Sequence, residues 1–579
     1  MLGLFGVYGS SEDLGNSVQF RDATGALSEQ VSSDGLGIRA VIWRTAALKF
    51  ADDQCFTRSA GWVTALWGVV LNRTALAKAQ PNESWSSVVA GQYAKRGASF
   101  FGDLRGNFAG AIFSEPTQKL TLFTDHFGSE PIFYAQRNGV LVFASQMKWI
   151  TEYFRFRGWH AEVSATGAYC LLSLGHMYAD YTLVDGVHRL LPGHCLEVDA
   201  QGAHASAYFQ VKADEQDITA NEAIPKLTEL FTKAVALQAD KNLEGGYEQY
   251  APLSAGLDSR MTVLGLKELG YAPINAFTYC QSGEEDCLRP MEIASDWGCN
   301  WLFKALDSAE ELHDIDRGAA VTEGSHFYAL GAQTDGFLRR IDTTRMGVVH
   351  TGTLGDGVLV SYYVRAKNPY QRTSYVLGNG ASSQKLVHRL AERITVDPVD
   401  YELGMFYNRG LNLINLTVQM AFRRYAYSMS PFMDIDFFNF AMSLPLRDRL
   451  DHRIYYQWVK SDFPAAARYP RNGVAIHNDP RINFFGVGTP LLSLPSSLVW
   501  RARGILGFRQ GMNPFQRWYD TNDRLKSVMD GYFHNHIDTV QSSKLLREDC
   551  ANLYQEGAVW DKILALSFLA STRYLELDR

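Results

Sequence analysis

Short apolar stretches separated by turn residues dominate the first 208 positions of the chain. They predict strands at Leu36–Trp43, Trp62–Leu71, Ala109–Phe113, Leu120–Phe123, Ile132–Ala135, Val140–Ala144 and Cys195–Val198. Apolar residues at helical spacing predict helices near Ser84–Arg96 and Val163–Leu172. Strands interrupted by a few helices indicate a layered α+β domain, which we place at residues 1–210.

A different order begins after a polar connection at residues 211–221. A long helix is predicted at Glu222–Lys241, and helices then alternate with strands at Gln249–Leu253, Ile274–Tyr279, Trp301–Phe303 and Gly347–Thr351. After about residue 400 the pattern is mainly helical. This alternation predicts an α/β domain at residues 220–579, with a parallel sheet that binds its ligands at the carboxyl ends of its strands.

The turn after the strand at residues 249–253 carries the clearest chemical signal. It leads from Leu253 into a helical pattern and reads Ser254-Ala255-Gly256-Leu257-Asp258-Ser259. Small and hydroxyl residues between a strand and a helix aim unpaired backbone N–H groups at one point, which suits phosphate. Asp258 could hold the Mg²⁺ that such phosphates carry. The hexapeptide by itself fits an ordinary βα turn with a serine cap equally well.

Composition places the chain among ordinary globular proteins and narrows its partners. It has 579 residues, too many for one core, with 46% apolar and 20% charged residues. A net charge of −7 disfavours binding to nucleic acid or to an anionic membrane.

No apolar segment predicts a membrane span. Ala60–Leu71, the longest apolar run, is too short to span a bilayer. The short apolar N-terminus has no basic flank and reads as a buried strand instead of a signal peptide.

Seven cysteines are scattered along the chain without a C-x-x-C pair. This spacing disfavours a disulfide framework or a zinc site and suits a reducing cytoplasm. We therefore expect a cytoplasmic protein without disulfide bonds.

Six short motifs occur in one order along the chain. The second half has Ser254–Ser259, Gly352–Gly357, and Ser430–Asp434 with Ala441–Pro445 behind it; the first half has Asp125–Pro131, Phe143–Lys148 and Leu191–His194. Together they resemble the asparagine synthetase superfamily, which includes asparagine synthetase B, β-lactam synthetases and lasso-peptide cyclases. The second-half motifs resemble its pyrophosphate loop, in part its Gly-Glu-Gly-x-Asp-Glu motif, and its Pro-Phe-Leu-Asp segment. The first-half motifs resemble its glutaminase signatures.

The resemblance implies an N-terminal Ntn-hydrolase-like αββα sandwich. A PP-loop ATP pyrophosphatase domain of the adenine nucleotide α-hydrolase type would follow, with a helical C-terminal region. The implied reaction uses ATP and Mg²⁺ to turn a carboxylate into an acyl-adenylate, which an amine attacks. Asp258 and Asp356 would bind the metal, and the first turn with Gly352 and Gly355 would bind the nucleotide. Thr353, Asp356 and Arg471 would be catalytic, and a homodimer would be in keeping with the family.

The first half departs from the family at its catalytic positions. Leu2 stands where the family has a cysteine nucleophile directly after the initiator methionine. The glutamine-holding Asn-Gly-Glu motif appears as Trp67-Gly68-Val69, and the later acid that grips the substrate falls near Trp85. We expect the two tryptophans and the valine to fill the former pocket. The first domain is therefore predicted to be a relic or docking module without glutaminase activity.

The second half departs at four positions. Ala255 replaces a loop glycine, and Thr353 and Gly357 stand where acids are usual. Arg471 replaces the lysine of the family's Arg-x-Pro-Lys-x-Gly segment; a guanidinium still neutralises phosphate but donates a proton less readily. Thr353 also leaves the general base unassigned.

Two further groups of charged residues are candidates. His388 and Glu392 lie four positions apart on a helical stretch and could supply the base, although a solvated helix face explains them better. A late basic cluster could recognise an anionic substrate, and a solvated surface is the simpler interpretation; it comprises Arg501, Arg503, Arg509, Arg517, Arg524 and Lys526.

The sequence thus predicts an amide synthetase that adenylates a carboxylate and passes the acyl group to an amine or to ammonia. Intramolecular cyclisation is one version. Loss of the glutaminase disfavours glutamine as nitrogen source and points to a specialised pathway. The alternative is a non-catalytic pseudo-synthetase that serves as a scaffold. Thr353, Gly357 and Arg471 favour the scaffold, whereas retention of both Asp258 and Asp356 argues against it.

Overall fold

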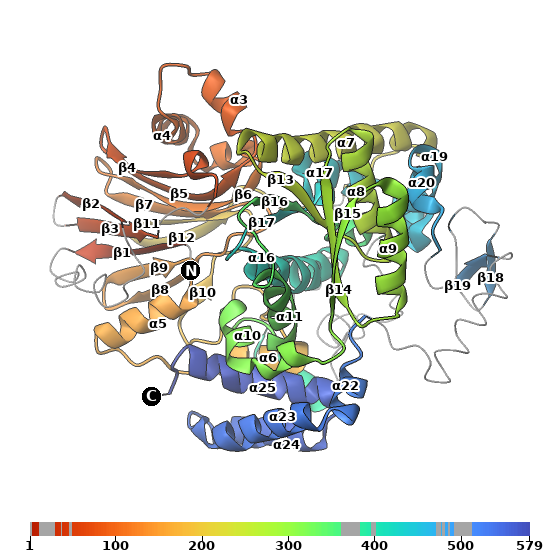
Figure 1. Ribbon diagram of the computed structural model, residues 1–579. Helices are drawn as coiled ribbons and strands as arrows, with labels where there is room; N and C mark the ends of the chain where they lie inside the picture. Colours follow the sequence, from red (N-terminus) through yellow and green to blue (C-terminus); the bar gives the residue numbers. More distant parts are fainter. Residues whose placement is uncertain are drawn as a thin grey trace.

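The computed structural model describes residues 3–10, 29–35, 38–45, 49–212, 214–360, 383–394, 401–470, 476, 481–484, 487–490 and 512–578. Within these ranges, two six-stranded antiparallel sheets, one five-stranded parallel sheet and one two-stranded ribbon are surrounded by helices (Figure 1). The protein is therefore a mixed α/β structure, as the alternation of apolar patterns predicts.

Two antiparallel sheets form the centre of the first half. The first has the order β10-β8-β9-β1-β3-β2 and consists of β1 (Leu4–Ser10), β2 (Glu29–Gly35), β3 (Ile38–Arg44), β8 (Phe133–Arg137), β9 (Val140–Ala144) and β10 (His188–Arg189). The second has the order β12-β11-β7-β6-β5-β4 and consists of β4 (Cys55–Ser59), β5 (Trp62–Val70), β6 (Gly106–Ser114), β7 (Lys119–Thr124), β11 (His194–Asp199) and β12 (Gly202–Ala207).

Helices cover the outer faces of both sheets. The second sheet carries α3 (Arg73–Lys78), α4 (Trp85–Arg96) and η2 (Gly97–Asp103), and the first carries α5 (Met147–Phe156) and α6 (Ala165–Leu174). Along β5, Val63, Ala65 and Trp67 face the core between the sheets, whereas Leu66 and Val70 face α4. This alternation follows from the two-residue period of a strand. The result is a four-layer helix–sheet–sheet–helix arrangement.

The parallel sheet lies in the second half. Its order is β15 (Asn300–Ala305), β14 (Ile274–Cys280), β13 (Glu248–Pro252), β16 (Met346–His350) and β17 (Tyr427–Met429). Each neighbouring pair runs parallel. The helices before and between these strands are α7 (Ala220–Glu244), α8 (Leu257–Glu268), α9 (Glu285–Trp297), η3 (Glu310–His313), α10 (Ile315–Val321), α11 (Tyr328–Leu338) and α12 (Gly355–Leu359). The predicted parallel sheet is confirmed.

Helices dominate the remainder of the described chain. They include α14 (Gln384–Ala391), α15 (Tyr401–Met405), the π-helix η4 (Phe406–Asn415), α16 (Leu416–Phe422), η5 (Pro431–Met433), α17 (Ile435–Met442), α18 (Leu446–Arg449), η6 (Leu450–His452), α19 (Arg453–Asp462) and α20 (Pro464–Ala467). After the ribbon of β18 (Arg481–Phe484) and β19 (Val487–Pro490) come α22 (Phe515–Thr521), α23 (Asp523–His536), α24 (Lys544–Glu556) and α25 (Val559–Tyr574).

Strands at sheet edges are the elements that the apolar pattern misses. β12 reads Gly-Ala-His-Ala-Ser-Ala, and β4 buries little beyond Cys55. Both lie at the edges of the second sheet, where one side of a strand has no partner strand to cover it. β17 has only three residues and is the edge of the parallel sheet. β4 and β12 bury little apolar surface, so their sequences lack the alternation on which strand prediction depends. β17 is buried but is too short to show a period.

The C-terminal helices return to the first half. In Figure 1, α23, α24 and α25 (blue) lie beside α6 and α10. Residues of α6, α24 and α25 belong to one continuous apolar cluster, which also includes Phe5 and Trp43 of the first sheet. The Tyr169 hydroxyl of α6 donates to Asp549 Oδ2 of α24 at 3.0 Å, and both residues are buried. The outer face of α6 is therefore covered by the end of the chain.

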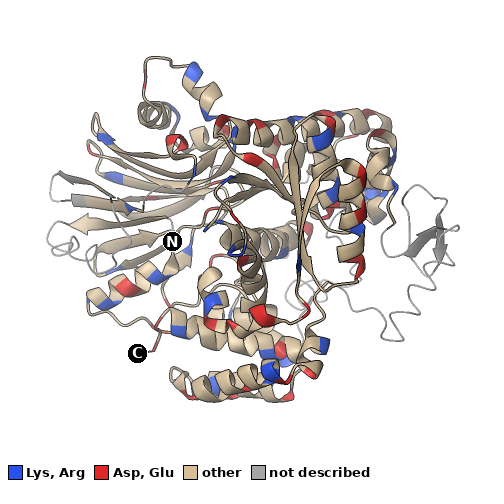
Figure 2. Ribbon diagram, in the orientation of Figure 1, with Lys and Arg blue, Asp and Glu red and all other residues tan. Residues whose placement is uncertain are grey.

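Charged residues of both signs are interspersed over the helices (Figure 2). No described helix is long and apolar enough to cross a membrane. All seven cysteines are free thiols, and six of them are buried.

Candidate functional site

A cavity of about 320 Å³ lies at the carboxyl ends of β13, β14 and β16. Eight of the residues predicted for the site line it: Leu253, Ser254, Gly256, Asp258, Ser259, Gly352, Thr353 and Asp356. The lining also has apolar and aromatic residues, namely Phe277, Tyr279, Val418, Phe422 and Met512. The cavity thus has a mixed polar and apolar lining and lies at the edge where parallel sheets bind ligands.

Three backbone amides of the loop between β13 and α8 already donate hydrogen bonds to nearby side chains. Ser254 N donates to Ser259 Oγ at 3.1 Å, Ala255 N to Asp286 Oδ1 at 3.0 Å, and Gly256 N to Ser254 Oγ at 3.0 Å. The expectation that these amides are unpaired is wrong, because side chains from the loop itself and from α9 reach them. A phosphate at this loop must instead use the first turn of α8, whose N-cap Gly256 offers no side chain.

Arg260 anchors this loop to a later part of the chain. Its side chain is 1% exposed, and its guanidinium donates to the carbonyl oxygens of Ala255, Ala466, Tyr469 and Pro470. The bond to Tyr469 is 2.7 Å long. A planar fork of donors suits several carbonyl oxygens at once. Arg260 therefore holds the segment that ends at Pro470 against the loop.

The two predicted motifs touch each other directly. Asp356 N donates to Asp258 Oδ2 at 3.0 Å. A Cβ atom on Gly352 would lie 2.5 Å from the backbone carbon of Asp258, and one on Gly355 would lie 2.6 Å from Asp258 Cγ. Only glycine permits such approaches. The glycines of the second turn thus allow it to pack onto the first turn.

The acidic residues of the cavity suit a nucleotide-borne Mg²⁺. Asp258 and Asp356 both line it, Asp356 being exposed and Asp258 partly exposed. Mg²⁺ in proteins is typically held by one or two carboxylates together with phosphate oxygens and water. The described residues contain no group of three or more His, Cys, Asp or Glu side chains placed to hold a metal. The pair therefore fits a metal that arrives with phosphate better than one held entirely by protein.

Three predicted residues in the described part of the chain do not line the cavity. Ala255 and Leu257 are buried, so the methyl group of Ala255 does not crowd the ligand side, and Leu257 packs into the core of the second half. Gly355 acts through its contact with Asp258. Arg471 lies outside the described residues.

The candidates for a general base separate in space. Thr353 lines the cavity, and its Oγ1 donates to Thr351 Oγ1 at 2.9 Å. His388 and Glu392 pair with each other at 3.3 Å, and their side chains are 78% and 54% exposed on α14. They are a solvated helix face. Of the late basic cluster, Arg501, Arg503 and Arg509 lie outside the described residues, and Arg517 and Arg524 are exposed.

Two polar residues of the site carry no motif of their own. Asp286, in the first turn of α9, lines the cavity and accepts the Ala255 amide. Tyr455 of α19 donates its hydroxyl to Asp258 Oδ1 at 2.6 Å. Neither is adjacent in sequence to a predicted turn. The acidic start of the helix after β14 could have indicated Asp286, whereas nothing in the local pattern singles out Tyr455.

The substituted positions of the first half are buried in three separate places. Trp67 is 3% exposed and packs between the two sheets, and Val69 packs beside Phe50 and Val348. Trp85 is the first residue of α4 and packs in the core between that helix and the second sheet. The indole N–H of Trp67 donates to Glu130 Oε2 at 3.1 Å. The three side chains therefore stabilise different cores. The expectation that they fill one former pocket is wrong. No side chain of the three is available to bind a polar amino acid.

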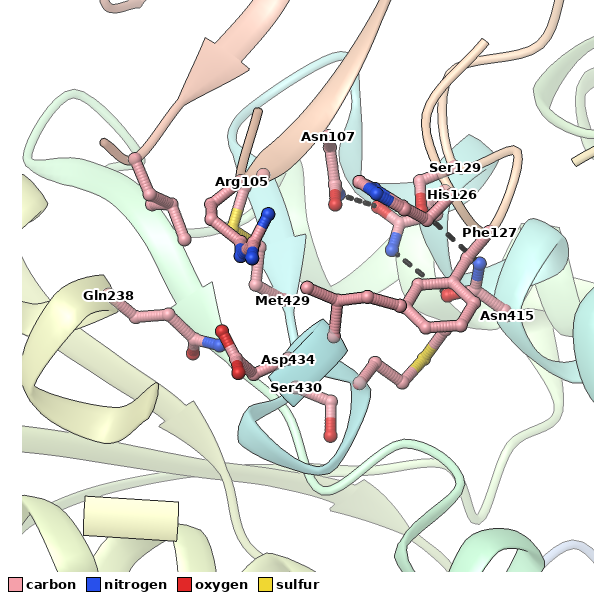
Figure 3. Close-up of a pocket in the computed structure, with 15 residues that line it drawn as sticks. Arg105, Asn107, His126, Phe127, Ser129, Gln238, Asn415, Met429, Ser430 and Asp434 are labelled. Carbon is pink, nitrogen blue, oxygen red and sulfur yellow. Dashed lines mark hydrogen bonds between the residues drawn. The ribbon is translucent and has the colours of Figure 1, made fainter. Parts of the chain in front are cut away.

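A small pocket of about 40 Å³ lies where the two halves meet (Figure 3). Figure 3 shows that Arg105, Asn107, His126 and Ser129 of the first half line it together with Gln238, Asn415, Ser430 and Asp434 of the second. The Asn107 side chain donates to the Ser428 carbonyl oxygen at 2.9 Å. This space holds about one to three water molecules and is too small for a nucleotide. It belongs to a closely packed polar interface.

We expect the stability of this region to depend on pH through Glu130. Burial raises the pKa of Glu130 to about 7. The stability that protonated Glu130 contributes is therefore fully present below the pKa that this residue has in the unfolded chain. It is lost as the pH rises through about 7. Between pH 4 and pH 8, the free energy of unfolding of Glu130→Gln minus that of wild type should rise by about 3 kcal/mol. Urea unfolding at the two pH values measures this change. Glu548→Gln, an exposed glutamate, is the control. A stability difference that stays constant with pH would contradict this expectation.

A comparison with family models matches part of the first half. A family model described as a glutamine amidotransferase domain matches residues 53–209. Amidase chyE of Penicillium rubens is 24% identical over 238 residues, which make up 37% of this chain and 33% of that protein. The alignment thus spans about a third of that relative's length.

Two solved structures are similar only at a low level. One is described as the allosteric regulatory enzyme of purine biosynthesis, with 10% identity and a TM-score of 0.27 over 71% of this chain and 96% of that one. The other is glutamine phosphoribosylpyrophosphate amidotransferase from B. subtilis complexed with ADP and GMP, with 12% identity and a TM-score of 0.26 over 72% and 98%. Such scores carry no argument about function. The family match does not depend on them: residues 53–209 match the model of a glutamine amidotransferase domain.

Proposed function

We propose that the chain is an ATP- and Mg²⁺-dependent amide synthetase of the asparagine synthetase type. It would couple a carboxylate to an amine and release AMP and pyrophosphate. The observation that carries this proposal is the direct contact between the Ser254–Ser259 and Gly352–Gly357 turns, which places Asp258 and Asp356 in one cavity. That cavity lies at the carboxyl edge of a parallel sheet, the usual position of a nucleotide site. The parallel-sheet half would then be a PP-loop ATP pyrophosphatase domain.

The residues of the cavity divide the work between them. The first turn of α8 would bind phosphate. Asp258 and Asp356 would hold the Mg²⁺, which when bound would offset the negative charge of pyrophosphate. The substrate carboxylate attacks the α-phosphorus of ATP, and the bond to pyrophosphate breaks. The amine then attacks the acyl carbon, and AMP leaves. The apolar side chains of Phe277, Val418 and Phe422 exclude water from the activated acyl group.

The first half would contribute no nitrogen from glutamine. Residues 53–209 match a glutamine amidotransferase domain, and the chain is similar to an amidase over part of its length. Amide chemistry agrees with both comparisons. However, Leu2 has no nucleophilic atom, and Trp67 and Val69 are buried where the family holds glutamine. The amine is therefore free ammonia or a group of the substrate itself.

A non-catalytic scaffold is the second candidate. The internal hydrogen bonds of Ser254, Ala255 and Gly256 favour it, because a ligand phosphate gains nothing from amides that are already bonded. The presence of both Asp258 and Asp356 in the lining of one cavity favours the enzyme, since a scaffold has no need of two carboxylates there.

An exchange assay decides between the two. We expect labelled pyrophosphate to enter ATP only when Mg²⁺ and a suitable carboxylate are both present, because adenylation is reversible. Added glutamine should not be hydrolysed. Absence of exchange with every carboxylate of the pathway, together with no binding of Mg·ATP in equilibrium dialysis, would establish the scaffold. Measurable glutamine hydrolysis would contradict the role given to the first half.

A further inference from the structure

We infer that Tyr455 is a positioning residue for the metal site, which holds the Asp258 carboxylate in its binding orientation through a hydrogen bond from the phenol. This inference rests on the proposed function. Tyr455 lies far from both turns in the sequence and reaches the site from α19, a helix that follows the five strands of the parallel sheet. Its hydroxyl donates to Asp258 Oδ1 at 2.6 Å.

The two oxygens of Asp258 have different donors. Oδ1 accepts from the Tyr455 hydroxyl, and Oδ2 accepts from the backbone N–H of Asp356 at 3.0 Å. Gly355 lies against Cγ of the same carboxyl group, where a Cβ would come within 2.6 Å. The carboxylate is therefore fixed from three directions.

Packing holds the phenol in place. Tyr455 is 1% exposed, and its ring lies 6.2 Å from the Phe432 ring and 6.0 Å from the Trp458 ring, measured between centroids. The indole of Trp458 is in turn fixed by a 2.8 Å hydrogen bond to Thr228 Oγ1 of α7. Phenylalanine would fill the same volume. The hydroxyl is thus the only part of Tyr455 that the packing does not require, and it points at Asp258.

A partner that orients a metal ligand changes metal affinity even though it never touches the metal. Loss of such a partner typically weakens binding about 10- to 100-fold, because the ligand must be ordered when the ion binds. A purely structural tyrosine would instead lower stability and leave the affinity of the folded protein for metal unchanged. Metal affinity therefore separates the two roles.

The test measures Mn²⁺ binding to the full chain by electron paramagnetic resonance in saturating ATP. We expect Tyr455→Phe to raise the Kd for Mn²⁺ about 10- to 100-fold and to leave the affinity for metal-free ATP within about twofold of wild type. In the exchange assay, a higher Mg²⁺ concentration should restore the rate of the variant. A matched control is Tyr554→Phe, since Tyr554 is also a buried tyrosine and donates to Asp530 at 2.6 Å, in the C-terminal helices.

The outcomes are distinct. If wild type and Tyr455→Phe bind Mn²⁺ in the presence of ATP equally well, the positioning role is wrong and the proposed function stands. If wild type binds no Mn²⁺ with ATP, the proposed function and the positioning role both fail. Weaker binding by Tyr455→Phe and by Tyr554→Phe alike would show a general effect of stability and would also overturn the inference.

Discussion

Replacement of Asp258 by alanine is expected to lower the rate of ATP–pyrophosphate exchange by about 1000-fold or more. The change removes a carboxylate that would hold Mg²⁺ and also removes the acceptor of the Tyr455 hydroxyl and the Asp356 amide. Loss of metal-assisted charge stabilisation costs several kcal/mol of activation free energy, and each 1.36 kcal/mol is tenfold in rate. The exchange assay measures the effect directly.

Two variants accompany that experiment. Asp258→Asn keeps the shape of the side chain and removes only its charge, so it should lose nearly as much activity as the alanine variant. Asp538→Ala removes a carboxylate that is 91% exposed in η8 (Ile537–Thr539) and should keep full activity. Exchange at the wild-type rate in Asp258→Ala would show that the metal site has been assigned to the wrong residue.

Replacement of Lys241 by methionine is expected to lower the free energy of unfolding by about 3–5 kcal/mol. Lys241 Nζ lies 2.6 Å from Asp53 Oδ1, and both side chains are 2% exposed. The pair joins α7 of the second half to η1 (Ala51–Asp53) of the first. Without the lysine, the buried Asp53 carboxylate loses its ion-pair partner and keeps the hydrogen bond from the Val70 amide. Urea unfolding followed by tryptophan fluorescence measures the change.

The same helix supplies the control. Lys226 pairs with Glu229 at 2.8 Å on the exposed side of α7, with side chains 45% and 63% exposed. Lys226→Met should cost less than about 1 kcal/mol, because exposed ion pairs contribute little. Adding Asp53→Asn to Lys241→Met should recover part of the loss, since no charge then remains buried. Equal losses from Lys241→Met and Lys226→Met would refute the special role of the buried pair.

Local patterns in the sequence predict most of the elements that position the site. The β13–α8 junction and the turn after β16 are visible because a strand, a small-residue turn and a helix follow one another within a few residues. The predicted strands at residues 62–71 and 347–351 correspond to β5 and β16 within a few residues. The parallel order of the sheet also follows from alternating strands and helices.

The chemistry within the loop was less predictable. Ser254, Ala255 and Gly256 have the composition of a phosphate loop, yet their amides are bonded to Ser259, Asp286 and Ser254 itself. Hydrogen-bond partners from α9 depend on how helices pack, and the loop sequence contains no information about that. Trp67 and Trp85 show the same limit, because their burial in two different cores depends on which face of a strand or helix each one occupies.

By itself, the sequence determined the local elements of this protein: the strands, the small-residue turns and the two aspartates placed at strand ends. Such features depend on residues a few positions apart, where the periods of strands and helices and the steric demands of turns act. Only the tertiary structure decided that Gly352 and Gly355 pack onto Asp258, that Tyr455 reaches its carboxylate, and that the C-terminal helices cover α6. Those contacts join segments far apart in the chain, and the packing of the whole core selects them.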